Sequence, residues 1–162
     1  MILSIDPSDT RHAWALVAPG PQLLAHGRDL DRDPLPDIGG ADVVIEMIAS
    51  YGMPVGANVF DTCVNIGRLL SRFPGARRLT RCEVKLSVCR VTRASDPHVR
   101  QAVIDRFGGP AAIRRGGALR GVAGDTWAAV AVALAAMDPE ARWYCPAGEW
   151  PAAGGADGKP AG

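Results

Sequence analysis

The sequence predicts a mixed α/β domain built on a sheet with strands in both orientations. Three short apolar runs separated by tight turns come first, as expected for an antiparallel meander. A continuous β-branched run follows, then a helical pattern over residues 55–73 and a further apolar run. A strand, helix, strand order of this kind is typical of parallel strands. The five predicted strands cover residues 2–5, 12–18, 22–27, 43–48 and 77–84.

The later elements are predicted from turn residues and apolar spacing. The run at 43–48 is continuous rather than alternating, which predicts a strand covered on both faces. Helices are expected over residues 95–107 and about 124–137, because each apolar pattern begins at a capping signal. Residues 29–41 and 111–122 are rich in turn residues, so we expect loops there, the second one mobile.

Length and composition favour one cytoplasmic domain. We expect residues 1–140 to form the domain and residues 141–162 a C-terminal extension, disordered from about residue 146. The sequence contains no apolar run long enough to span a membrane, and its start lacks the basic region of a signal peptide. The cysteines fit no zinc signature, so we interpret them as small buried side chains in a reducing compartment.

Charge is segregated along the chain although the net charge is only +1. Residues 1–67 carry 3 Lys/Arg and 9 Asp/Glu, whereas residues 68–120 carry 13 Lys/Arg and 3 Asp/Glu. Residues 121–162 are acidic again, with 2 Lys/Arg and 5 Asp/Glu. A concentrated basic segment is typical of proteins that bind a phosphate backbone. A solvated Arg-rich face is the alternative interpretation.

Three acids stand where a carboxylate is costly. Asp6 ends an apolar strand, Glu46 interrupts the most hydrophobic strand, and Asp125 opens the most hydrophobic helix. If the two strands are neighbours and the helix packs on the sheet, the three carboxylates converge. Converging carboxylates suit Mg²⁺ or Mn²⁺, and two such ions about 4 Å apart can drive phosphodiester hydrolysis.

Each acid also has a structural interpretation. Asp6 precedes Pro7 and can form a turn, Glu46 can pair with a buried Arg, and Asp125 can be an N-cap. Other chemistries have less support, because no His lies beside a nucleophile motif and no Walker or GxGxxG loop follows a strand.

Three motifs resemble those of RuvC-type Holliday junction resolvases, in the ribonuclease H-like superfamily. They are Ile-Asp-Pro-Ser at 5–8, Val-Val-Ile-Glu at 43–46 and Gly-Asp-Thr-Trp-Ala-Ala at 124–129. Residues 45–70 and 83–107 look closer still to resolvases of bacteriophage origin. The resemblance covers about residues 1–138 and implies a ribonuclease H-like mixed five-stranded sheet flanked by helices, in a protein of a bacterial or phage-infected cell.

The resemblance assigns roles to four residues. Asp6, Glu46 and Asp125 match the acids that hold two Mg²⁺ ions, with Mn²⁺ as a possible substitute. Lys85 matches a catalytic lysine that contacts DNA near the scissile phosphate. The family's fourth ligand, three residues before the last acid, corresponds here to Val122.

Substitutes for the missing family residues can be named. Asp9 and Asp96 are candidates for a fourth metal ligand, although Asp96 can equally be an N-cap before Pro97. The family's second lysine is absent, so Arg93 or Arg100 is expected to supply its charge to DNA.

Two further features of the family concern the junction and the dimer. Tyr51 corresponds to an aromatic that stacks on an unpaired base, with a packed loop aromatic as the alternative. The helix at 55–73 corresponds to the one that forms the homodimer, although its spacing also suits a helix that only covers the sheet.

The resulting hypothesis is a Mg-dependent endonuclease that resolves four-way junctions or other branched DNA in recombination and repair. One alternative is a ribonuclease H-like nuclease on flaps, hybrids or structured RNA. Another is a non-catalytic nucleic-acid-binding accessory protein.

Overall fold

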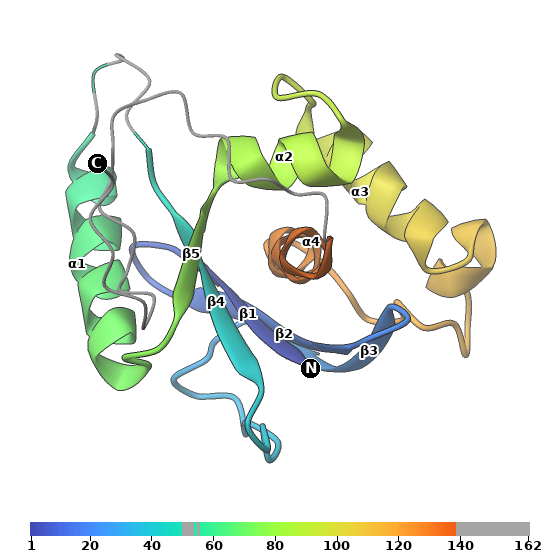
Figure 1. Ribbon diagram of the computed structural model, residues 1–162, viewed down its shortest axis with the longest axis horizontal. Helices are drawn as coiled ribbons and strands as arrows, with labels where there is room; N and C mark the ends of the chain where they lie inside the picture. The colour runs from blue at the N-terminus through green and yellow to red at the C-terminus, as the bar shows by residue number, and fades with distance from the viewer. Residues whose placement is uncertain (50–53, 55, 139–162) are drawn as a thin grey trace, which may run out of the picture.

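A computed structural model describes residues 1–49, 54 and 56–138 of the chain (Figure 1). Its centre is a five-stranded sheet in the order β3-β2-β1-β4-β5. The first three strands are antiparallel, whereas β4 and β5 run parallel to β1. The predicted mixed sheet is therefore confirmed. The strands are β1 (Ile2–Pro7), β2 (His12–Ala18), β3 (Gln22–Gly27), β4 (Asp42–Met47) and β5 (Arg77–Thr80).

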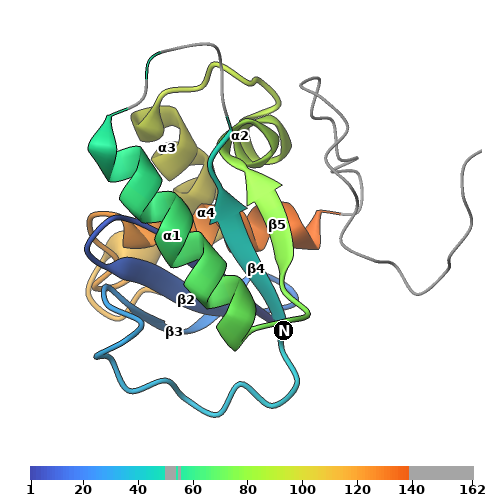
Figure 2. The same ribbon diagram turned by 90° about the vertical axis from the view of Figure 1, so that its left-hand side faces the viewer.

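Helices cover both faces of the sheet. One face carries α1, which crosses it diagonally, and the other carries α2, α3 and α4 (Figures 1 and 2). The central helix, α4, packs on β1 and β2. The helices are α1 (Ala57–Arg72), α2 (Arg81–Cys89), α3 (Asp96–Arg106) and α4 (Thr126–Met137), with a short 3-10 helix η1 at Gly109–Ile113.

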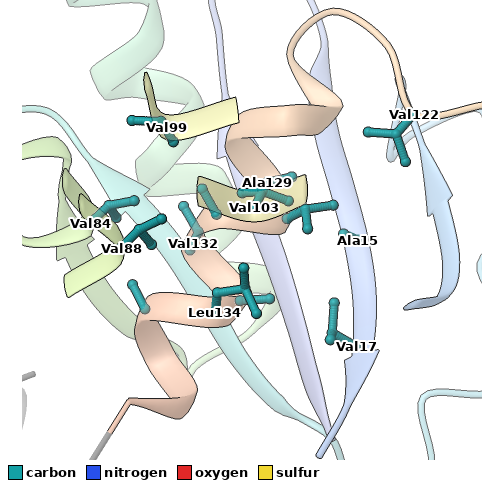
Figure 3. Packing of buried hydrophobic residues seen from close by; sticks show 14 of the residues in the cluster. Ala15, Val17, Val84, Val88, Val99, Val103, Val122, Ala129, Val132 and Leu134 are labelled. Atoms are coloured by element: carbon teal, nitrogen blue, oxygen red, sulfur yellow. The ribbon is translucent and has the colours of Figure 1, made fainter. Parts of the chain in front are cut away.

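Two hydrophobic cores follow from the alternation of side chains along the strands. Leu3 and Ile5 of β1 join the core beneath α1, whereas Ile2 joins the core beneath α4. Figure 3 shows the second core, in which Val84 and Val88 of α2 approach the apolar side chains of α4. The same alternation turns Ser4 and then Asp6 toward the face that carries α4.

The helix α4 is buried almost all round, as its composition predicts. The side chains of residues 129–133 are fully buried, and three of these five residues are alanines. Such small side chains allow α4 to lie close against the strands. The Thr126 hydroxyl donates a 3.3 Å hydrogen bond to the Gly27 carbonyl, which fixes the first turn of α4 beside β3.

The strand predicted over residues 77–84 is wrong in its second half. It ends at Thr80, and α2 begins at Arg81. A capping box causes the change, because the Glu83 carboxylate accepts a 2.6 Å hydrogen bond from the Thr80 backbone N–H and the Thr80 hydroxyl accepts one from the Glu83 N–H. Cys82 therefore lies in a helix.

Two other expectations are corrected. The segment 111–122 is not an open loop, because Leu119 is buried and its N–H donates a 2.8 Å hydrogen bond to the Ala112 carbonyl. Cys63 lies exposed on α1 and is not a core side chain. In the described part of the chain, no helix is long and apolar enough to cross a membrane. The predicted C-terminal extension lies outside the described residues.

Candidate active site

Asp6 and Glu46 lie side by side at the carboxyl edge of the parallel strands. Ile5 of β1 is paired with Ile45 of β4, and each acid is the next residue of its strand. Both side chains point to the face covered by α2, α3 and α4, because side chains alternate along a strand. The turn after β1 is held by Ser8, whose hydroxyl accepts a 3.1 Å hydrogen bond from the Arg11 N–H. Asp6 is therefore a strand residue and not the turn former.

The surroundings of the Asp6 and Glu46 carboxyl groups disfavour their negative charge. Burial raises the pKa of Asp6 to about 8, with further contributions from the negative charges of Glu46 and Asp125 and from a hydrogen bond to Glu46. The Arg81 guanidinium opposes this rise. Burial also raises the pKa of Glu46, against the lowering effect of Arg81. Two neighbouring carboxylates repel each other when both are ionised, so a cation bound between them would stabilise the site.

Arg81 is a member of this site that sequence reasoning did not name. Its Nη1 lies 3.4 Å from Glu46 Oε2, and its Nη2 donates a 2.7 Å hydrogen bond to Asp96 Oδ1. Burial lowers the pKa of Arg81, but the charges of Glu46, Asp96 and Asp6 outweigh this effect and raise it overall. Its position in the sequence could have indicated this role, because Arg81 directly follows β5, which runs parallel to β4.

The third acid, Asp125, lies nearby at the N-cap of α4. Its side chain makes no capping hydrogen bond, and its charge contributes to the raised pKa of Asp6. Within the described residues, however, no three Asp, Glu, His or Cys side chains form a group that could hold one metal ion. A pocket of about 190 Å³ opens beside the acid pair, and its lining residues are Asp6, Pro7, Glu46, Met47, Ile48, Ala49 and Arg81.

Lys85 and Asp96 do not line this pocket, but their charges act on Glu46, which does. Lys85 is on α2, one turn after Arg81, and its charge lowers the pKa of Glu46. Asp96 is the first residue of α3, whereas Ser95 occupies the N-cap. The hydrogen bond from Arg81 lowers the pKa of Asp96. Asp96 is therefore part of the charge network of the site and not an N-cap.

The other predicted residues lie farther from the acid pair or outside the described residues. Arg93 is exposed in the turn between α2 and α3, and Arg100 stacks 4.7 Å from the Trp127 ring centroid. Asp9 is exposed in the turn after β1 and does not line the pocket. Val122 is buried in the core. Tyr51 lies outside the described residues.

Comparison with known proteins gives a match in structure but none in sequence. No family model and no curated protein matches the chain. RuvC of Thermus thermophilus matches with a TM-score of 0.56 and 17% identity, over 83% of this chain and 91% of that chain. This chain has a RuvC-like fold. The T. thermophilus RuvC in complex with a Holliday junction substrate matches with a TM-score of 0.53 and 15% identity, over 83% and 90%.

In this RuvC-like fold the site offers carboxyl groups and positively charged side chains. Two neighbouring carboxyl groups at the ends of paired strands provide oxygen ligands for a hard divalent cation. Asp125 adds a third carboxylate, exposed at the head of α4. Arg81 and Lys85 add positive charge beside the acids, where a phosphate could be held.

Proposed function

We propose that this chain is a metal-dependent endonuclease that resolves Holliday junctions or related branched DNA. The proposal rests on the crowded pair Asp6 and Glu46 at the carboxyl edge of a RuvC-like sheet. The solved relative that carries a Holliday junction supports a junction as the substrate. We extend the proposal to a resolvase of bacteriophage type, which the resemblance of residues 45–70 and 83–107 to such resolvases implies.

Asp6 and Glu46 would hold two Mg²⁺ or Mn²⁺ ions together with Asp125, whose side chain would have to move toward the pair, because the three acids do not form a metal-binding group among the described residues. When bound, such ions activate water and stabilise the oxygen that leaves in phosphodiester hydrolysis. The protein supplies ligands fixed by backbone pairing, since Asp6 and Glu46 follow paired positions of two neighbouring strands. The core beneath α4 gives these strands a rigid support.

The basic residues would bind the DNA backbone. Lys85 would contact the phosphate near the cut, while Arg93 and Arg100 lie on the α2–α3 side and would hold flanking phosphates. The contact with Trp127 holds the guanidinium of Arg100 in one place, at the first turn of the helix that Asp125 opens. Binding of this kind depends strongly on salt and weakly on sequence.

A homodimer would present two such sites to the junction. The helix α1 lies on the outside of the sheet (Figure 2). Its exposed side chains include Phe60 and Val64, which are 62% and 55% exposed, and Cys63. Gly67 continues this face, and a Cβ there would meet nothing within 4 Å. Glycine within a helix costs about 1 kcal/mol, and no described residue of the same chain packs closely enough against Gly67 to require it. Close approach of a second α1 would provide one.

The decisive experiment is cleavage of a labelled four-way junction in Mg²⁺, beside a linear duplex and a flap. The wild type should make symmetric nicks in the junction. Asp6→Asn should cut at least about 100-fold more slowly, because a ligand is lost, yet bind the junction as tightly or more tightly. Asp42→Asn is the matched control, because Asp42 is an exposed acid at the opposite end of β4.

Each other outcome has a defined meaning. If Asp6→Asn cuts as fast as the wild type, the assigned site is wrong. Cleavage of flaps or RNA–DNA hybrids in place of junctions would reject the substrate and retain the acid site. Binding without cleavage in either Mg²⁺ or Mn²⁺ would reject the nuclease and favour an accessory protein.

A further inference from the structure

Arg81 connects two carboxylates that come from different elements. Its Nη1 lies 3.5 and 3.4 Å from the two carboxylate oxygens of Glu46 on β4, and its Nη2 lies 2.7 Å from Asp96 Oδ1 on α3. The Glu46 side chain is 10% exposed, whereas that of Asp96 is 78% exposed. One end of the guanidinium therefore faces the buried acid, and the other is held at the rim of the site.

The two contacts differ in strength. A separation of 2.7 Å is typical of a strong charge-assisted hydrogen bond, whereas 3.4 to 3.5 Å is near the outer limit for one. Asp96 is therefore the main anchor of Arg81. The attraction between Arg81 and Glu46 is mainly electrostatic, so a cation with a higher charge can replace Arg81 there.

The backbone of Arg81 is fixed while its side chain can pivot. Arg81 follows Thr80, whose capping box with Glu83 sets the first turn of α2. The planar guanidinium has donors at both ends and can bridge two carboxylates, which the single ammonium group of a lysine does less well. Movement of the guanidinium toward Asp96 would free Glu46 without any change in the backbone.

We propose that Arg81 is a resident counter-cation of the acidic centre, which a divalent cation must displace from Glu46, and that Asp96 assists by holding the displaced guanidinium. This inference rests on the proposed function, because it takes Glu46 as a cation ligand. Arg81 and Asp96 are then positioning residues that set the affinity of the centre for cations. Asp96 acts through Arg81 and is not itself the fourth ligand.

The test is isothermal titration calorimetry, in which the full-length protein is titrated with Mn²⁺ in the absence of DNA. Arg81→Gln should bind Mn²⁺ roughly tenfold more tightly than the wild type, within the usual range for coupling between two sites. Asp96→Asn should weaken binding, because Arg81 then neutralises Glu46 alone. In an Arg81→Gln background, Asp96→Asn should change nothing. Arg32→Gln is the control, because it removes one positive charge from a side chain that is 87% exposed.

Comparison of the single variants with the double variant separates this inference from the alternative that Asp96 is a direct ligand of the cation. If Arg81→Gln binds Mn²⁺ no more tightly than the wild type, the inference is overturned while the proposed nuclease stands. If Asp96→Asn weakens binding equally in both backgrounds, Asp96 is a direct ligand and its assigned role is wrong. If neither the wild type nor Arg81→Gln binds Mn²⁺, the inference and the proposed function fail together.

A second variant keeps the test valid if Arg81→Gln does not fold. Arg81→Lys retains the charge but loses the two-ended bridge, so it should bind Mn²⁺ more tightly than the wild type. Thermal unfolding in chelator should show a lower midpoint for both variants, because Glu46 then lacks its bridging partner. Wild-type Mn²⁺ affinity in a folded Arg81→Lys protein would overturn the inference.

Discussion

Ile5 of β1 lies opposite Ile45 of β4, and this single pairing sets Asp6 beside Glu46. Parallel strands end at the same edge of a sheet, so two acids that each follow a paired residue must be neighbours. A shift of one residue in this register would turn one carboxylate to the α1 face. The apolar cores on both faces therefore fix the position of the acids.

Asp6→Asn should stabilise the cation-free protein. Asp6 lies in a crowded environment dominated by burial and by the charge of Glu46. An amide can donate to Glu46 and carries no charge, so the free energy of unfolding in chelator should rise by about 1–3 kcal/mol. Urea unfolding at neutral pH measures this change. Asp42→Asn should have almost no effect on the free energy of unfolding. If Asp6→Asn were less stable than the wild type, the environment of Asp6 would not disfavour a carboxylate.

Under the proposed function, Lys85→Gln should weaken DNA binding, because it removes one proposed phosphate contact. The affinity should fall similarly for junctions of different sequence, and the slope of log K against log salt should become shallower by about 1. Binding measured across a salt series gives both quantities. The exposed Arg32 supplies the control, since Arg32→Gln should leave the slope unchanged. An unchanged slope for Lys85→Gln would remove this residue from the DNA interface.

Phe60→Asp should convert the proposed homodimer to a monomer. Phe60 is exposed at the centre of the apolar face of α1, and a carboxylate there would be buried against a second copy. Gly67→Ala should stabilise the helix by about 1 kcal/mol and yet weaken association, because the added methyl keeps the two helices apart. Sedimentation at a series of concentrations measures both effects. Ile113→Asp, at an exposed apolar residue of η1, should leave the mass unchanged.

The sequence was sufficient to predict the acid pair because the signal was local. A carboxylate in an apolar strand is costly, and on that ground the sequence indicated Asp6 at the end of one strand and Glu46 within another. The five strands and the two-sided burial of β4 were predicted from the same apolar patterns. The end of β5 was misplaced, although Thr80 and Glu83 carried the spacing of a capping box.

Arg81 could not be assigned from local patterns. Its partners Glu46 and Asp96 lie 35 and 15 residues away in the chain. Their approach depends on the parallel pairing of β5 with β4 and on the packing of α3 against α2, which no short motif encodes. The exposure of Cys63 has a similar cause, because it depends on which face α1 turns toward the sheet.

Gly27→Ala should destabilise the fold. A Cβ at Gly27 would collide with the Asp33 carboxylate and with the indole of Trp14, which approach the backbone closely there. Relief of the clash requires movement of a buried ring, so we expect a loss of about 1–3 kcal/mol in the free energy of unfolding. Gly75→Ala is the matched control, because a Cβ at Gly75 meets nothing within 4 Å. Equal stability of the two variants would show that β3 can shift to make room.

Asp33 should make the stability of the protein depend on pH in the acid range. Its Oδ2 accepts a 2.8 Å hydrogen bond from the Asp29 N–H and a 3.0 Å hydrogen bond from Trp14 Nε1. The bond from Asp29 is the main cause of the lowered pKa of Asp33, burial opposes it, and the bond from Trp14 adds to it. Because the folded-state pKa lies below the ordinary value, the stabilisation is present above about pH 4 and is lost as pH falls through the folded-state pKa.

Asp33→Asn should therefore lower the free energy of unfolding by about 1–2 kcal/mol at pH 7. The difference between wild type and variant should shrink as the pH falls below about 4, because Asp33 of the unfolded wild-type chain is protonated first and the folded carboxylate follows at lower pH. Urea unfolding at several pH values measures this difference, with Asp42→Asn as an exposed control. If the difference stayed constant down to pH 3, it would come from the shape of the asparagine side chain, and the charge of Asp33 would not be its source.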